Sequence, residues 1–181
     1  MTPFSLHGIG VSNGIAIGKA HLISNALLEV VQYDIDLKNI PHEIKRFEDA
    51  VNTVRIELNK IKSQLPSDAP GELEAFIDTH IMILNDKSLS VLPKSIIENE
   101  KCNAEWAIKK QMDSVVNQFD QIKDQYLRER KQDVIQVVER VIKILLGHSN
   151  QITVKNKEKL TILVAHDISP ADALHFKNHK Y

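Results

Sequence analysis

The sequence predicts an α+β protein in which a helical-hairpin bundle of about four helices is inserted into a partial α/β subdomain. Two observations predict this class. Helical periodicity is almost continuous over residues 39–147, whereas β-like runs with turn residues occupy residues 6–33 and return after residue 151. Because the β-like segments flank the helical block, we expect them to meet in one subdomain. The expected parts are residues 1–36, 37–148 and 149–181.

Short β-like runs predict the strands of the α/β part. Three of them, Ile15–Ile17, Ala20–Ile23 and Glu29–Val31, follow a glycine-rich start in which the turn residues are Gly8, Gly10, Gly14 and Gly18. A fourth strand is predicted at Leu160–Ala165. A helix should begin at Ser169, since this residue can cap it and proline occupies the next position.

The first predicted helix has a regular apolar stripe and ends at Pro66. Its apolar residues recur at alternating spacings of three and four, which predicts a long seam against a neighbouring helix. They are Ile44, Phe47, Val51, Val54, Leu58, Ile61 and Leu65.

The rest of the helical block should complete two helical hairpins. A helix over residues 71–86 is followed by a break and a short continuation over residues 88–99. The next helix begins at Asn103 as its cap and runs through Phe119. The last carries a stripe of Val134, Val138, Val141 and Leu145 and ends at Gly147, which suits a left-handed conformation.

The helix over residues 71–86 has too many apolar residues for one buried stripe. One face carries Leu73, Ile77, Ile81 and Leu84, and the other side carries Ala75, Phe76, Met82 and Ile83. Between Ser63 and Asp86 there are five acids and no lysine or arginine. The second face is therefore predicted to dock a partner that is basic and has a hydrophobic centre.

Composition excludes several classes of protein. A single cysteine, Cys102, allows no internal disulfide and no thiolate metal site. The net charge of -1, without a Lys/Arg cluster among aromatics, argues against nucleic-acid binding. Apolar runs fall short of the roughly 20 residues that cross a bilayer, and the N-terminus does not resemble a secretory signal. We expect a cytoplasmic protein that does not enter membranes.

Four segments carry a family resemblance. They are GIGVSNGIAIGKA at residues 8–20, EAFIDTHIMILND at 74–86, DQYLRERKQDV at 124–134 and LTILVAHDISPADA at 160–173. Together, in this order, they resemble Enzyme I of the bacterial phosphoenolpyruvate:sugar phosphotransferase system, the phosphoenolpyruvate-protein phosphotransferases. The match spans nearly the whole chain, which makes it far more specific than any single segment.

The resemblance implies a fold and an activity for the parent protein. Members of the family take a phosphoryl group from phosphoenolpyruvate onto a histidine and pass it to the small phosphocarrier HPr. That histidine lies on an α/β swivelling subdomain, a helical subdomain binds HPr, and a C-terminal barrel domain binds phosphoenolpyruvate with Mg²⁺. The family's histidine lies in a G-G-x-T-S-H motif that this sequence does not reach by Tyr181. We therefore expect no catalytic residue, cofactor or metal in this chain, which should be a monomer that binds HPr without catalysing transfer.

The resemblance also places the HPr-docking residues. Position by position, they are Glu72, Ala75, Phe76, Thr79, His80, Met82, Ile83, Leu127 and Arg130. Three positions depart from the acids common in the family, namely Gly71, Lys87 and Ser88.

Alternatives remain for these residues and for the function. Phe76 and Ile83 could belong to the core, His80 could be a packed histidine, and Arg130 could pair locally with Asp133 or Glu129. The chain could instead belong to the nitrogen-branch paralogue, which serves a different carrier. A non-enzymatic helical hairpin that self-associates through the spare face is a further possibility.

Overall fold

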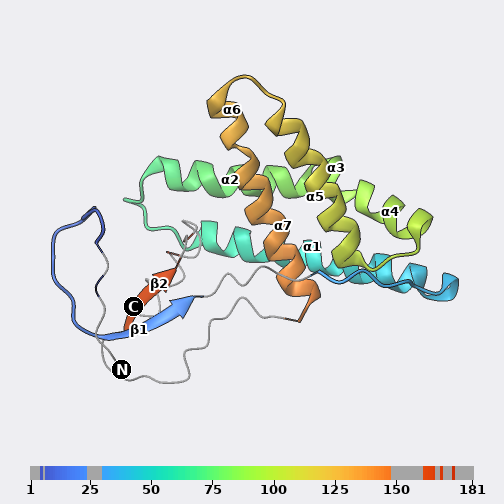
Figure 1. Ribbon diagram of the computed structural model, residues 1–181, viewed down its shortest axis with the longest axis horizontal. Helices are drawn as coiled ribbons and strands as arrows, with labels where there is room; N and C mark the ends of the chain where they lie inside the picture. Colours follow the sequence, from blue (N-terminus) through green and yellow to red (C-terminus); the bar gives the residue numbers. More distant parts are fainter. Residues whose placement is uncertain are drawn as a thin grey trace.

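Two crossed layers of helices form the body of the protein in the computed structural model, which describes residues 5, 7–23, 30–147, 161–165, 168 and 173. Helices α1 (Ile40–Ser63) and α2 (Gly71–Asn85) form one hairpin. Helices α5 (Ala104–Asp120) and α7 (Lys131–Leu145) form a second hairpin that lies across the first (Figure 1). The predicted bundle of two helical hairpins is confirmed.

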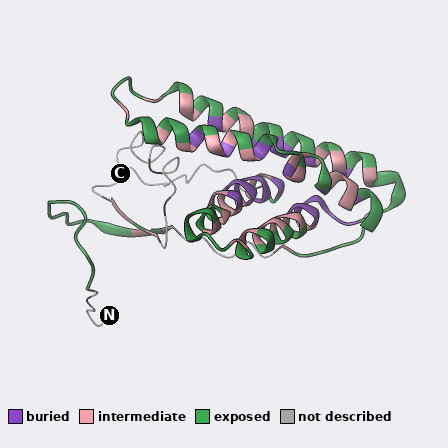
Figure 2. Cartoon of the chain, turned by 90° about the horizontal axis from the view of Figure 1, so that it is seen from above, coloured by how far each residue is buried: buried purple, intermediate pink, exposed green. Residues whose placement is uncertain are grey.

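Helix α1 carries the predicted stripe. Phe47, Val51, Val54 and Leu58 are buried in the core, and Ile44, Ile61 and Leu65 pack against it. Burial is concentrated where the two layers face each other (Figure 2). A short 3₁₀ helix, Leu37–Asn39, leads into α1, and the helix ends three residues before Pro66.

The segment after α2 is divided into two short helices. Asp86 adopts an extended conformation and ends α2, and its side chain accepts a hydrogen bond from the Ser88 N–H (2.8 Å) to begin α3 (Lys87–Ser90). Helix α4 (Leu92–Glu100) follows, with Pro93 in its first turn, where a missing N–H costs nothing. The break predicted near Asn85 is confirmed, and Val91 adds a second one.

Helix α7 lies at the centre of the bundle, where it contacts α1, α2, α5 and the short α6 (Gln125–Glu129). Its predicted stripe is buried, together with Val137 and Ile142. Gly147 follows the helix with φ of +73°, the left-handed conformation predicted for it.

The described strands form a small parallel pair. Strand β1 (Lys19–Ile23) pairs with β2 (Thr161–Ala165), so that Lys19 lies opposite Thr161 and Ile23 opposite Ala165. The predicted union of N-terminal and C-terminal strands is confirmed.

Two of the other predicted strands do not form as expected. Ile15–Ile17 is not a strand, and both isoleucines are almost fully exposed, since no neighbouring strand among the described residues pairs with them. Val30 and Val31 are not in a strand either, while Glu29 lies outside the described residues. The start of the last predicted helix, at Ser169, also lies outside them, although Ala173 is helical.

Asn103 occupies the cap position of α5 but does not cap the helix with its side chain. Its amide nitrogen donates to the Val31 carbonyl (3.1 Å), and its amide oxygen accepts from the Tyr33 N–H (3.1 Å). The Ala104 N–H at the start of α5 is satisfied by the Glu43 carboxylate instead (2.7 Å). Asn103 therefore fastens the segment before α1 to the bundle.

A buried ionic cluster joins three helices around Arg46. The Arg46 guanidinium donates to Glu43 on α1 (2.5 and 3.1 Å) and to both oxygens of Glu105 on α5 (2.8 Å each). It also donates to the Leu145 carbonyl at the end of α7 (3.0 Å). Both carboxylates are buried, so each depends on this cation for its compensation.

The Arg46 cluster makes the free energy of unfolding depend on pH. Burial disfavours the charged form of Glu105, but hydrogen bonds from Arg46, a backbone N–H and Asn103 outweigh it and hold the pKa of Glu105 below its usual value. A carboxylate with a lowered folded-state pKa stabilises the fold above its unfolded pKa of about 4.3. This contribution is lost as the pH falls through the folded-state value.

We therefore expect Glu105→Gln to lower the free energy of unfolding at pH 7 by about 1 to 3 kcal/mol. Below about pH 4.3, wild type should lose stability more steeply than the variant, so that the two curves converge. Urea unfolding from pH 7 to pH 3 measures both effects. Glu98→Gln, at an exposed acid on α4, controls for the loss of one charge. Parallel pH profiles for wild type and Glu105→Gln would show that this carboxylate is not coupled to folding.

Candidate docking face

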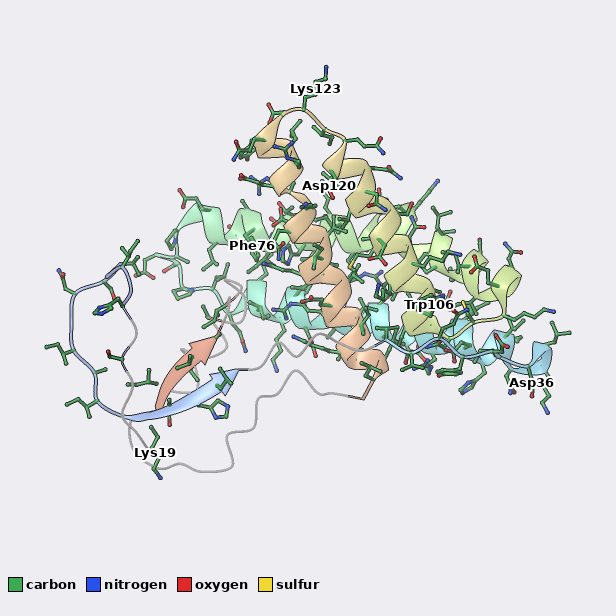
Figure 3. All side chains as sticks on the ribbon, viewed as in Figure 1. Lys19, Asp36, Phe76, Trp106, Asp120 and Lys123 are labelled. Carbon is green, nitrogen blue, oxygen red and sulfur yellow. The ribbon has the colours of Figure 1, made fainter. Side chains whose placement is uncertain are left out.

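Helix α2 packs against both α1 and α7, which explains its excess of apolar residues. Ile77 and Leu84 are buried, and Ile81, Phe76 and Ile83 are partly buried and pack against the core. Phe76 lies close to the point where α7 crosses α2 (Figure 3). Phe76 and Ile83 are thus partly covered, and each keeps some surface beside the exposed Met82.

A narrow line of α2 residues stays accessible. Glu72, Ala75 and Met82 are exposed and Thr79 is half-buried; we call these four residues the α2 stripe. Their spacing of three, four and three keeps them on one face of the helix. Met82 is 75% exposed, whereas the Thr79 hydroxyl is already satisfied by the Ala75 carbonyl (2.8 Å).

His80 belongs to the interior. It is fully buried, and its ring packs against Phe76 with the ring centroids 4.1 Å apart. Of the two alternatives for this residue, the structure places it as a packed histidine. His80 can therefore affect the α2 stripe only from beneath, through the helix that it helps to anchor.

Helix α6 presents two more exposed apolar side chains. Tyr126 is 64% exposed and Leu127 is 48% exposed. Asp124 caps α6 by accepting from the Leu127 N–H (3.0 Å). Asp120, labelled with Lys123 at the top of Figure 3, accepts a hydrogen bond from Lys131 and so ties the end of α5 to the start of α7. The polar contacts thus fix the turn that carries both apolar side chains.

Arg130 is held at the corner between α6 and α7. Its guanidinium carbon lies 4.7 Å from the centroid of the Tyr126 ring, and Nη2 donates to the Tyr126 hydroxyl. Nη1 donates to Asp133 (3.3 Å). The hydroxyl and the carboxylate raise the pKa of Arg130. The expected local pairing with Asp133 is present, while Glu129 accepts from Gln125 (2.9 Å).

Several of the acids predicted to make α2 negatively charged are already engaged by neighbouring side chains. Lys62 of α1 donates to Asp78 (2.7 Å) and pairs with Glu74 (3.2 Å). Asp86 is engaged by Ser88, whose hydroxyl and N–H lower the pKa of the Asp86 carboxylate. Glu72, by contrast, is exposed in the first turn of α2. The acid of the α2 stripe is therefore Glu72 alone.

Sequence reasoning missed Tyr126. Its signal was available, since an aromatic residue four positions before an arginine on a helix places a ring beside a cation. The region otherwise consists of apolar side chains with charges beside them, an arrangement suited to binding a protein surface. Among the described residues, no group of three or more His, Cys, Asp or Glu side chains could hold a metal ion. No described helix is both long enough and apolar enough to cross a membrane.

Comparison with known proteins identifies a matching protein family and several relatives. The sequence model of a protein family, described as PEP-utilising enzyme, N-terminal, matches residues 7–130. A phosphoenolpyruvate-protein phosphotransferase of Cupriavidus necator is 46% identical over 97% of this chain, and one of Bacillus subtilis is 32% identical over 92%. The chain spans 31% and 29% of the lengths of these two relatives.

Solved structures agree in fold. An NMR solution structure of Enzyme I superposes with a TM-score of 0.73 and 27% identity, covering 90% of this chain and 65% of that one. A structure described as the N-terminal domain of Enzyme 1 - Nitrogen has a TM-score of 0.68 and covers 89% and 65%. Its 23% identity supports the fold alone. The chain belongs to the family of PEP-utilising enzymes and corresponds in sequence and fold to the N-terminal domain of Enzyme I.

Proposed function

We propose that this chain supplies the HPr-docking helices of a phosphoenolpyruvate-protein phosphotransferase. In the whole protein, a phosphoryl group would pass from phosphoenolpyruvate to a histidine and then to HPr, for sugar uptake. The names of the relatives support the activity, and the exposed α2 stripe supports the docking role. We place the Mg²⁺ of the whole protein with its phosphoenolpyruvate-binding domain, and the docking role proposed for the described helices needs no metal.

The chemistry of the transfer explains why such a face is needed. Phosphoryl transfer between two imidazoles requires their nitrogens to be close and in line, and positioning supplies most of the catalysis. The carrier must also leave quickly for its next partner. A modest interface with an apolar centre and charged residues at its rim meets both needs.

The proposal rests mainly on the exposure of Met82, because the other large apolar side chains of α2 are wholly or partly buried. Exposing apolar surface to water is unfavourable, and an adaptable methionine is common at protein-binding surfaces. Leu127 on α6 is the second exposed apolar residue of the proposed site, with Glu72 and Arg130 as its charged residues. Phe76, His80 and Ile83 would hold the α2 stripe in place from below.

We expect Met82→Ala to weaken HPr binding by about 1 to 3 kcal/mol, because it removes the largest exposed apolar side chain of the α2 stripe. Isothermal titration of the chain with the HPr of the same organism measures this loss. Ile56→Ala is the matched control, since Ile56 is 60% exposed on α1 but lies away from that helix's buried stripe. Equal affinities for wild type and Met82→Ala would remove Met82 from the site.

Sedimentation without HPr separates docking from self-association. If the α2 stripe serves only to dock HPr, both wild type and Met82→Ala should sediment as monomers. A dimer that forms without HPr and is abolished by Met82→Ala would assign the α2 stripe to self-association instead.

Glu72→Lys should act on the rate of encounter. Because the proposed carrier surface is basic, reversing this charge should lower the association rate constant several-fold at low salt and change the dissociation rate little. The difference should shrink at about 0.5 M salt, where screening is strong. Stopped-flow binding at two salt concentrations measures this, with Glu98→Lys on α4 as the control for net charge. An effect of Glu72→Lys that is confined to dissociation would contradict electrostatic steering.

A further inference from the structure

Tyr126 and Arg130 form a compact unit on an exposed corner of the molecule. The guanidinium lies over the ring at 4.7 Å, and the hydroxyl of the same ring accepts one of its N–H groups. Asp133 accepts a second N–H, and its side chain is only 13% exposed. Arg130 is thus held by the ring and hydroxyl of Tyr126 and by the carboxylate of Asp133.

Tyr126 and Arg130 lie in a turn whose two ends are held by other polar contacts. Asp124 caps α6 directly before Tyr126, and the contact between Lys131 and Asp120 ties α5 to α7 directly after Arg130. The ring therefore has a defined position before any partner arrives. Nearly half of the Arg130 side chain stays open to solvent, and Tyr126 is an exposed residue.

An arginine side chain that is held in place loses less conformational entropy when it binds a partner. A free arginine on a surface samples many rotamers and must lose them when it meets a partner. A guanidinium that is already held beside a ring and by hydrogen bonds loses fewer rotamers, which increases the affinity that its remaining donors provide. Tyr126 and Asp133 engage two of the five N–H donors of an arginine, and the others can reach an acceptor on another protein.

We propose that Tyr126 is a positioning residue of the docking face, which holds the Arg130 guanidinium in the orientation that meets HPr. This inference rests on the docking function proposed above. It assigns to Tyr126 a role exerted through Arg130, distinct from that of Met82 and Leu127, which would contact the carrier themselves.

The test is a double-mutant cycle on HPr affinity, measured at low and at high salt with the full chain. Tyr126→Ala should weaken binding about 2- to 5-fold at low salt, the range expected for an exposed cation–π pair. In the Arg130→Ala background the same change should have almost no effect. Tyr126→Phe, which keeps the ring and removes the hydroxyl, should fall between wild type and Tyr126→Ala. Met82→Ala is the control, because its loss should be equal in both backgrounds.

A second measurement needs no partner. In the free chain, ¹⁵N relaxation of the Arg130 Nε–H group should report a restricted side chain in wild type and a mobile one in Tyr126→Ala. Circular dichroism should show the same helix content for both proteins, so that the loss of order is local.

The outcomes separate the two proposals. If Met82→Ala and Arg130→Ala weaken binding but Tyr126→Ala acts equally in both backgrounds, Tyr126 is an independent contact and the positioning role is wrong. The positioning role is also wrong if Arg130 Nε–H is equally mobile in wild type and Tyr126→Ala. If neither Met82→Ala nor Arg130→Ala changes HPr affinity, the docking face itself is misplaced and the role of Tyr126 falls with it.

Discussion

Helix α2 carries more apolar surface than one neighbouring helix could cover, and two helices of the bundle share the burial of this surface. The fold places α2 against α1 on one side and α7 on the other, so that a wide arc from Ile83 to Ile81 is wholly or partly covered. The line opposite this arc has no helix to meet among the described residues, and the α2 stripe lies there. The same packing that stabilises the bundle therefore determines which residues of α2 are left for a partner.

The polar contacts keep this arrangement rigid. The Arg46 cluster joins the start of α1, the start of α5 and the end of α7, and Asn103 adds the segment that precedes α1. At the opposite end of α7, the contact between Lys131 and Asp120 fixes the turn that carries α6. A carrier that docks on α2 and α6 would thus meet a surface whose parts hold constant positions, as in-line transfer requires.

Periodicity was sufficient to predict the long helices but not which helices would surround each of them, and it placed two strands, at residues 15–17 and 29–31, that do not form as expected. The stripes of α1 and α7 and the left-handed Gly147 were predictable, since spacing and glycine conformation are local properties. The partial burial of Phe76 and Ile83 could not be predicted, because spacing shows that a residue is apolar but not how many helices surround it. Asn103 was predicted as a cap from its position, whereas its side chain binds residues about 70 positions earlier in the chain. Tyr126 was missed although its contact with Arg130, four positions later in the chain, is also local.

The proposed function requires that a carrier protein binds directly on the α2 stripe, which the bundle leaves uncovered. The most direct measurement is a set of intermolecular NOEs between HPr and a chain with ¹³C-labelled methyl groups on methionine, leucine and isoleucine. If HPr docks there, NOEs should join HPr to the methyl groups of Met82 and Leu127, and none should reach the buried Ile97 or Ile56 on α1. A complex whose NOEs leave out Met82 and Leu127 and come from another face of the bundle would contradict it.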